Sequence, residues 1–290
     1  MLTIEGVLIY GVVLGAVYLL VAMGFSLICG VLGIFNLGYS ATILVAVYGV
    51  WMIMSTFGLG LTFGIIGVFF LQVLFTLAIL YYVIIKPNME KEDVLLTALL
   101  LLSLIVEAAV NYWYPLSTGV DLPTTILEGV VRIGQVTLPR QMFVVVAAAL
   151  IITIAFIIFF TKTRMGLKVR ALSQDHRAAR ILGVNVERVY ALAIILAVLP
   201  PTICMIVVAP MWAINPKMGH SLFQTAILVT ILGGLGNLRG TLLASFIVGL
   251  IAASVNFLLN PRLVSLAILV VVFAVMMIKP EGIAKSETIW

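Results

Sequence analysis

Charged residues are scarce in this sequence: only 9% of its 290 residues are Asp, Glu, Lys or Arg, while 64% are hydrophobic and the mean hydropathy is +1.30. A water-soluble domain needs far more polar surface than this composition supplies. The apolar runs are long and nearly continuous, whereas the strands of a membrane barrel alternate over roughly 10 residues. The composition therefore predicts an all-α, polytopic membrane protein, because a helix satisfies its own backbone groups inside a bilayer.

Cysteine, histidine and phosphate-binding loops are also scarce or absent. Cys29 and Cys204 lie in separate apolar runs, which argues against a disulfide. His220 has no second ligand nearby, so we expect no metal and no cofactor. The pattern Gly-x-x-x-x-Gly-Lys-Ser/Thr does not occur, so the chain cannot itself supply an ATPase. The net charge of +5 does not indicate nucleic acid binding, because positive charge on a membrane protein usually marks cytoplasmic loops.

Nine apolar segments approach the length of about 20 residues that a membrane-spanning helix needs. They cover residues 6–29, 37–56, 62–85, 93–112, 140–161, 189–210, 221–236, 240–259 and 262–279. No long polar stretch separates them, so residues 1–290 are expected to form a single transmembrane domain. Glycines interrupt the regions 29–42 and 221–242, which are therefore candidates for broken or re-entrant helices. The expected number of spanning helices is about eight or nine.

The positive charges predict the orientation. If residues 162–188 face the cytoplasm, twelve of the sixteen Lys and Arg residues lie inside and four lie outside. The opposite orientation reverses the ratio, so the positive-inside rule places the N-terminus outside and the C-terminus in the cytoplasm.

The two glycine-interrupted regions resemble each other, because each combines several glycines with one asparagine. Broken helices in the two halves of a transporter expose backbone groups to a solute and mark its path. Close packing of helices is the alternative explanation for the glycines, but neither amide suits a lipid environment. The candidate path residues in these regions are Asn36, Gly233, Gly234, Gly236 and Asn237.

One charged segment stands between two apolar runs. Residues 162–188 read KTRMGLKVRALSQDHRAARILGVNVER and hold seven of the sixteen Lys and Arg residues. Ser173 is a candidate N-cap for a short helix with Asp175 in its first turn, Gly183 is a natural helix end, and Asn185 can cap the next helix near Val186. Such a helix could be received by a soluble partner. The alternative is a basic loop that fixes topology and touches anionic lipid.

The segment RMGLKVRALSQDHRAARILGVNVERVYAL, residues 164–192, closely resembles the cytoplasmic coupling segment of branched-chain amino acid (Liv-type) ABC transporter permeases. Three further motifs resemble that family in the right order. They are Gly15 to Leu27 with Asn36, the set Pro216, Gly219 and Gly233–Gly236, and Val275 to Gly282.

The resemblance implies a non-catalytic permease in a bacterial inner membrane. It implies a second, related permease subunit, two cytoplasmic ATP-binding subunits and an extracytoplasmic solute-binding protein as partners, besides membrane lipid. By this analogy Ala178, Ala179 and Gly183 form the coupling helix, while Arg177 and Arg180 face the ATPase. The expected solute is a branched-chain or other amino acid.

One position departs from the family pattern. A His-Gly pair is common soon after the first asparagine, but this sequence has Tyr39-Ser40 there. A path-lining imidazole would thus be replaced by the phenol of Tyr39. This departure leaves other small solutes open, including urea, amides and carboxylates.

Three further residues in apolar segments are candidates for a role in transport. Glu107 is an ionisable group towards the outer end of its helix, and it either lines the path or makes a structural contact. Pro200 and Pro201 remove backbone donors in mid-helix, which predicts a kinked or broken helix that acts as a hinge or as a static bend.

Two alternatives to an importer subunit follow from the residues. A self-sufficient secondary transporter or channel would need intramembrane charges in relay or ion-site arrangements, and Glu107 is nearly alone. A membrane scaffold without a path would not need the paired Gly-Asn breaks.

Overall fold

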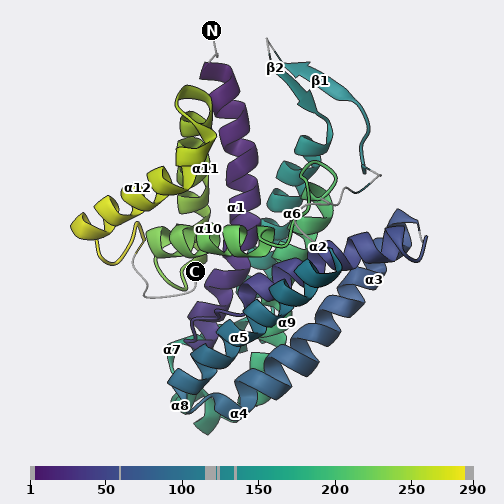
Figure 1. The fold of residues 1–290 in the computed structure, drawn as a ribbon. Helices are drawn as coiled ribbons and strands as arrows, with labels where there is room; N and C mark the ends of the chain where they lie inside the picture. Colours follow the sequence, from purple (N-terminus) through teal and green to yellow (C-terminus); the bar gives the residue numbers. More distant parts are fainter. Residues whose placement is uncertain (1–3, 59, 115–121, 123–124, 134–135, 285–290) are drawn as a thin grey trace.

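Long helices dominate the computed structural model, which describes residues 4–58, 60–114, 122, 125–133 and 136–284 (Figure 1). The helices are α1 (Ile4–Leu32), α2 (Tyr39–Ser55), α3 (Leu61–Leu74), the π-helix η1 (Phe75–Ile85), α4 (Lys86–Asn88), α5 (Glu92–Trp113), α6 (Gln141–Lys162), α7 (Arg164–Gln174), α8 (His176–Ile181), α9 (Val186–Val208), α10 (Met218–Gly233), α11 (Leu238–Leu258), the 3-10 helix η2 (Pro261–Leu263) and α12 (Val264–Ile278). The strands β1 (Val130–Ile133) and β2 (Val136–Pro139) form one antiparallel hairpin, in which Val130 pairs with Pro139.

Seven helices in the described part of the chain are long and apolar enough to cross a membrane. Two more apolar helices, α2 and α10, are shorter, with 17 and 16 residues. Both adjoin the glycine-interrupted regions, and α10 runs across the molecule instead of along α1 (Figure 1). The predicted all-α, polytopic membrane fold is confirmed, and the order of its apolar segments agrees with the sequence.

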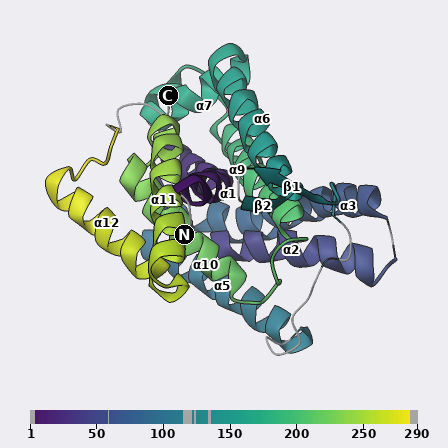
Figure 2. The ribbon, with the colours of Figure 1, turned by 90° about the horizontal axis from the view of Figure 1, so that it is seen from above.

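Helix α1 forms the centre of the molecule, with α6, α9, α10 and α11 packed around it (Figure 2). Its contact with α11 is close because small residues line it. A Cβ atom built on Gly15 would lie 2.7 Å from the Phe246 ring and 3.0 Å from the Phe246 Cα. On α11, a Cβ on Gly249 would lie 2.6 Å from the carbonyl oxygen of Gly11.

Helices α2, α3, η1 and α5 form a second group beside this centre. Polar side chains join them inside the apolar interior. The Gln72 amide of α3 donates to the Thr42 carbonyl at 3.2 Å, and the hydroxyls of Ser40 and Ser103 join α2 to α5. Such hydrogen bonds hold helices together where lipid offers no polar alternative.

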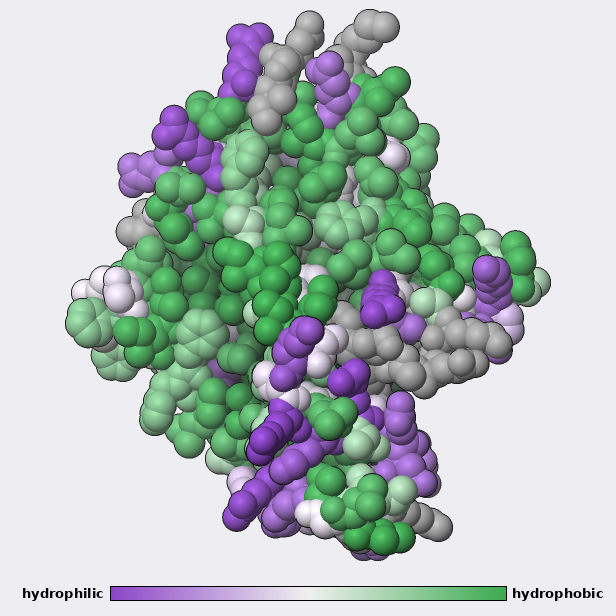
Figure 3. All heavy atoms as spheres, turned by 180° about the vertical axis from the view of Figure 1, so that it is seen from behind, coloured by the Kyte–Doolittle hydropathy of each residue, from purple (hydrophilic) through white to green (hydrophobic). Residues whose placement is uncertain are grey.

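The outer surface of the helices is apolar. Phe70 on α3 is 73% exposed, Ile151 on α6 is 66% exposed and Phe273 on α12 is 65% exposed. Figure 3 shows a broad hydrophobic band, with hydrophilic residues gathered mainly at the end that carries α7 and α8. This distribution suits a chain whose sides face lipid and whose ends face water.

Helix α9 continues through both Pro200 and Pro201, so it is not broken there. The Ala197 carbonyl loses its usual helical donor, because Pro201 has no N–H. That carbonyl faces Gly24 of α1, where any Cβ atom would collide with it. The prolines therefore lie beside a close approach of α1 and α9, and their role as a hinge stays a prediction.

Candidate functional site

The charged loop between α6 and α9 folds into two helices. The Thr163 hydroxyl accepts a hydrogen bond from the Gly166 N–H at 2.9 Å, which caps α7. On the inner side of α7, Val169 and Leu172 are buried. A Cβ on Gly166 would lie 2.6 Å from the Phe160 Cα, so α7 folds back tightly onto the end of α6. This part of the loop is anchored to the core.

The second helix, α8, has a defined start and end. Ser173 was predicted as its cap, but Ser173 lies within α7 and its hydroxyl donates to the Arg170 carbonyl at 2.7 Å. The cap is Asp175, whose carboxylate accepts from the Ala178 N–H at 3.0 Å. The prediction was wrong because no local signal indicates that α7 continues to Gln174.

Helix α8 ends as predicted at Gly183, which has φ +79°. The Val184 N–H donates to the Ala179 carbonyl at 3.1 Å, the bond expected when a left-handed glycine closes a helix. Asn185 then caps α9, because its side-chain oxygen accepts from the Arg188 N–H at 3.1 Å. Both of these predictions are confirmed.

The exposed surface of α8 is apolar at its end. Ile181 is 86% exposed and Leu182 is 81% exposed, whereas Ala179 is buried. Ala178 is exposed, and the side chains of Arg177 and Arg180 lie outside the described part of the structure. The coupling residues expected from the sequence do not include the Ile-Leu pair, although two apolar residues directly before a helix-ending glycine on a charged loop are a usable signal.

A cavity of about 860 Å³ opens beside this apolar pair. It lies between the end of α8, the loop that follows η1, and the first glycine-interrupted region. Its lining includes Leu32, Ile34, Lys86, Lys91, Ile181 and Tyr190. The charged loop therefore adjoins the first break across one groove.

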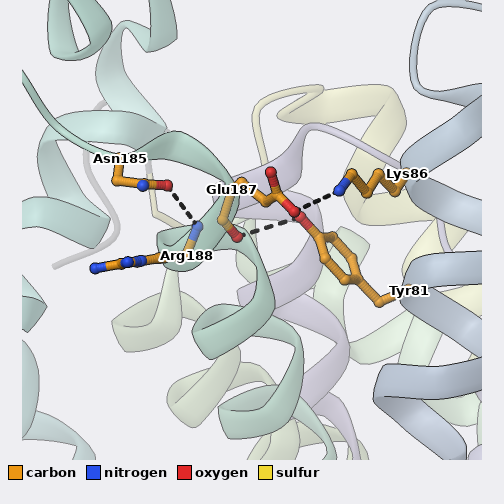
Figure 4. A network of polar contacts seen from close by, with 5 residues as sticks. All are labelled: Tyr81, Lys86, Asn185, Glu187 and Arg188. Carbon is orange, nitrogen blue, oxygen red and sulfur yellow. Dashed lines mark hydrogen bonds and ion pairs between the residues drawn. The ribbon is translucent and has the colours of Figure 1, made fainter.

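A small polar network ties the start of α9 to the end of η1 (Figure 4). The Glu187 carboxylate forms an ion pair with Lys86, and the Glu187 backbone carbonyl accepts from the Tyr81 hydroxyl at 3.2 Å. The ion pair is exposed on both sides, while the Tyr81 ring is buried. The ammonium of Lys86 also lies 5.3 Å from the centre of the Tyr82 ring. No sequence motif indicated this network, since its members lie about a hundred residues apart.

The two glycine breaks touch each other. A Cβ on Gly30 would lie 2.9 Å from the Cα of Gly236, and a Cβ on Gly236 would lie 2.6 Å from the Cα of Gly30. Two backbones therefore meet here with no room for a side chain. Gly33 and Gly236 both have positive φ, +66° and +79°, as the chain turns out of one helix and towards the next.

The asparagines of the two breaks have local partners. The Asn36 side-chain oxygen accepts from the Gly38 N–H at 3.0 Å, and the Asn237 oxygen accepts from the Gly240 N–H at 2.9 Å and caps α11. Both residues are buried. The Asn36 amide nitrogen is buried without a hydrogen-bond partner.

The segment after α12 packs against the second break. The Ile283 N–H donates to the Leu232 carbonyl at 2.8 Å. Gly234 has φ +99°, and a Cβ there would lie 3.2 Å from the Glu281 carbonyl oxygen. A Cβ on Gly282 would lie 2.9 Å from the Cα of Gly234. The break at 233–237 is thus enclosed by Gly30 on one side and by residues 281–284 on the other.

The remaining predicted path residues lie apart from the two breaks or inside the core. Tyr39 is fully buried, its hydroxyl donates to the Val21 carbonyl at 2.7 Å, and its ring lies 5.6 Å from that of Phe25. Glu107 is half-buried on α5, one turn beyond Ser103. A role of either residue in a path stays a prediction.

Comparison with protein families identifies a match over most of the chain. The family model of the branched-chain amino acid transport system permease component matches residues 7–278.

Several curated proteins are similar over most of their length. The chain is 24% identical to the high-affinity branched-chain amino acid transport system permease protein LivH of Escherichia coli K12, covering 94% of this chain and 92% of that protein. It is 25% identical to LivH of Salmonella typhimurium with the same coverage. BraD of Pseudomonas aeruginosa, another permease protein of a high-affinity branched-chain amino acid transport system, is 20% identical over 56% of this chain and 53% of its own length.

Similarity in fold extends to a solved structure. PsaBC from Streptococcus pneumoniae, in complex with Fab, superposes with a TM-score of 0.54 at 18% identity, covering 96% of this chain and 92% of that chain.

Proposed function

Because the chain belongs to the family of branched-chain amino acid transport system permease components, we propose that it is the transmembrane permease subunit of a binding-protein-dependent ABC importer. It forms part of the path for a small polar solute, and separate ATPase subunits dock on residues 162–188. The reaction that drives transport takes place on those subunits, since the sequence contains no phosphate-binding loop.

The exposed apolar pair on the charged loop carries this proposal. Ile181 and Leu182 are almost fully exposed on a short helix whose ends are fixed by Asp175 and Gly183. A loop that only sets topology needs neither a capped helix nor two exposed large apolar side chains. Exposed apolar side chains beside basic residues instead suit the groove of a soluble partner.

The surface around Ile181 also indicates the orientation of the protein in the membrane. Lys86 and Lys91 line the groove that Ile181 also lines, so the basic loops lie at one end of the molecule. The positive-inside rule assigns this end to the cytoplasm, where ATP-binding subunits are found. The β1–β2 hairpin and the N-terminus then face outwards, towards a solute-binding protein. A second permease subunit, related or identical, completes the path in the inner membrane.

The proposed solute is a branched-chain amino acid, because the family description and the similar permeases name that transport system. The Tyr39 phenol does not stand free in place of the family's imidazole, since its hydroxyl is bonded to the Val21 carbonyl. Urea, amides and carboxylates are the other solutes to compare in an uptake assay.

A self-sufficient secondary transporter or channel is the competing function. Such a protein needs buried ionisable groups in relay. In the described part of the chain, every buried polar side chain is a neutral amide or hydroxyl, from Ser26 and Asn36 to Ser245. This observation favours a permease whose transport is powered by ATP hydrolysis on separate subunits.

ATP hydrolysis by the purified complex tests the proposal. The variant pair Ile181→Ser and Leu182→Ser removes the exposed apolar surface and leaves the core intact, so it should lower ATPase retention and abolish solute-stimulated hydrolysis. Leu258→Ser with Leu259→Ser is the matched control, because these residues are 67% and 71% exposed at the other end of the molecule. If wild-type protein transports leucine without any ATP-hydrolysing subunit, the importer assignment is wrong.

A further inference from the structure

The C-terminal end of the charged loop contacts a helix that lies about a hundred residues earlier in the sequence. Glu187, in the first turn of α9, makes two contacts with the continuous helix η1–α4: its carboxylate pairs with Lys86 at the start of α4, and its backbone carbonyl accepts from Tyr81 of η1 (Figure 4). The carboxylate contact is solvent-exposed and therefore weak. The Tyr81 contact comes from a ring that is only 1% exposed, so it is the mechanically firmer of the two.

The Tyr81 ring belongs to a separate buried cluster. Its other members are Leu80, Ile85, Leu95, Leu99 and Ile194, from η1, α5 and α9. Leu32, Ile34 and Leu37, the residues that flank the first glycine break, pack against this same cluster. The cluster therefore fills the space between the exit of the charged loop and the break.

Helix α5 extends the contact to the far side of the break. A Cβ on Gly38 would lie 3.2 Å from the Leu99 side chain and 3.3 Å from the Leu99 carbonyl oxygen. One turn along α5, Ser103 is hydrogen-bonded to Ser40 at the start of α2. A displacement of α5 or η1 would thus press directly on backbone of the break, because packed interiors transmit strain.

The helix that carries Tyr81 is itself unusual. Residues Phe75–Ile85 form eleven residues of π-helix, directly continuous with the α-helix α3. π-helical segments are rare and are frequently found at functional sites. A shift of this segment towards α-helical bonding would rotate Tyr81 relative to α3.

We propose that η1, held by Glu187 at Tyr81 and at the adjoining Lys86 of α4, is the relay that passes movement of the ATPase-docking loop to the first Gly-Asn break. Tyr81 is the main positioning residue, Lys86 and Glu187 keep η1 in register with α9, and Leu99 delivers the movement to Gly38. The inference rests on the proposed function, because it needs an ATPase that moves the loop.

The break contains a natural reporter of its own movement. Cys29 lies in the last turn of α1 beside Gly30 and is partly exposed, whereas Cys204 is buried and serves as an internal reference. The experiment uses the complete complex with its ATP-hydrolysing subunits in lipid nanodiscs. The rate of Cys29 alkylation by N-ethylmaleimide is measured without nucleotide and with ATP and vanadate.

In the wild-type complex the alkylation rate should change about fivefold or more between the two conditions. About fivefold is the lower end of the effects that coupled sites usually have on each other. Tyr81→Phe should remove most of this change without altering basal ATP hydrolysis. Tyr82→Phe is the matched control, because the neighbouring ring is 51% exposed and should leave the response intact. Lys86→Glu should weaken the response, and Lys86→Glu combined with Glu187→Lys should restore it.

Two results would overturn the relay alone. One is a Tyr81→Phe complex that hydrolyses ATP and keeps the wild-type change at Cys29. The other is a wild-type complex that hydrolyses ATP while the Cys29 rate stays constant. A wild-type preparation that retains no ATP-hydrolysing subunit overturns the proposed function instead, and the relay with it.

Discussion

The contact between the two glycine breaks can be tested by placing one methyl group at two comparable positions. Gly33 and Gly236 both have left-handed backbone, with φ +66° and +79°, so alanine costs about 1–2 kcal/mol in either place. They differ in their surroundings. A Cβ on Gly33 meets nothing within 4 Å, whereas a Cβ on Gly236 would lie 2.6 Å from the Gly30 Cα.

The difference between the two variants therefore isolates the contact. An added methyl in a packed interior costs about 1–3 kcal/mol, and here the obstacle is backbone, which cannot rotate away. Gly236→Ala should thus be less stable than Gly33→Ala by about 1–3 kcal/mol. With about 2–4 °C for each kcal/mol in a large chain, the additional decrease in Tm is about 2–12 °C.

The assay is thermal unfolding of the purified complex, followed by tryptophan fluorescence at one fixed scan rate because unfolding of such proteins is often irreversible. ATP-driven leucine uptake is measured on the same preparations. Equal decreases in Tm for Gly33→Ala and Gly236→Ala would show that the two breaks do not touch in the working protein, and would refute the enclosed arrangement of residues 30 and 233–237.

Three further pairs of substitutions test individual hydrogen bonds and one helix end. Thr76→Val removes a buried hydroxyl that has no partner, so stability should stay equal or rise by about 1 kcal/mol, whereas Thr241→Val loses two hydrogen bonds and should lower stability by about 1–3 kcal/mol in denaturation assays. Gln141→Leu breaks three hydrogen bonds to backbone groups and should cost about 2–4 kcal/mol by the same measurement; the exposed Gln224→Leu should change little. Gly183→Ala should impair solute-stimulated ATP hydrolysis more than Gly183→Asn, because asparagine tolerates the positive φ of the α8 end; equal impairment would contradict this reason.

Local signals in the sequence predicted much of the fold. Long apolar runs predicted the order of the helices. A segment that crosses a membrane must be long enough to span it and must satisfy its own backbone hydrogen bonds, and few structures other than a helix meet both conditions. Gly183 and Asn185 were assigned correctly because helix ends depend on the residue itself and its near neighbours. Ser173 was assigned wrongly because Asp175, two residues later, is an equally good cap, and only the extent of α7 decides between them.

Contacts between distant segments could not be predicted in the same way. The likeness of the two breaks suggested a shared role but not that Gly30 would touch Gly236. The pairing of Lys86 with Glu187 depends on how η1 and α9 pack, and no periodicity in either segment encodes it. The packing of Gly282 on Gly234 likewise depends on where α12 ends. These contacts are properties of the tertiary arrangement, and they make up most of the candidate site.

The two asparagines show how far capping explains the resemblance between the breaks. In each break the chain leaves a helix through glycine and begins the next helix within a few residues. The Asn237 oxygen caps α11, whereas the Asn36 oxygen accepts the Gly38 N–H in a turn just before α2. The oxygen would be equally well supplied by aspartate or serine. The turn contact therefore does not explain the Asn36 amide nitrogen, which is buried without a partner at a cost of about 1–3 kcal/mol. An unpaired donor at this point is suited to an acceptor oxygen, such as that of water or of a solute carboxylate, and less suited to a solute's ammonium group.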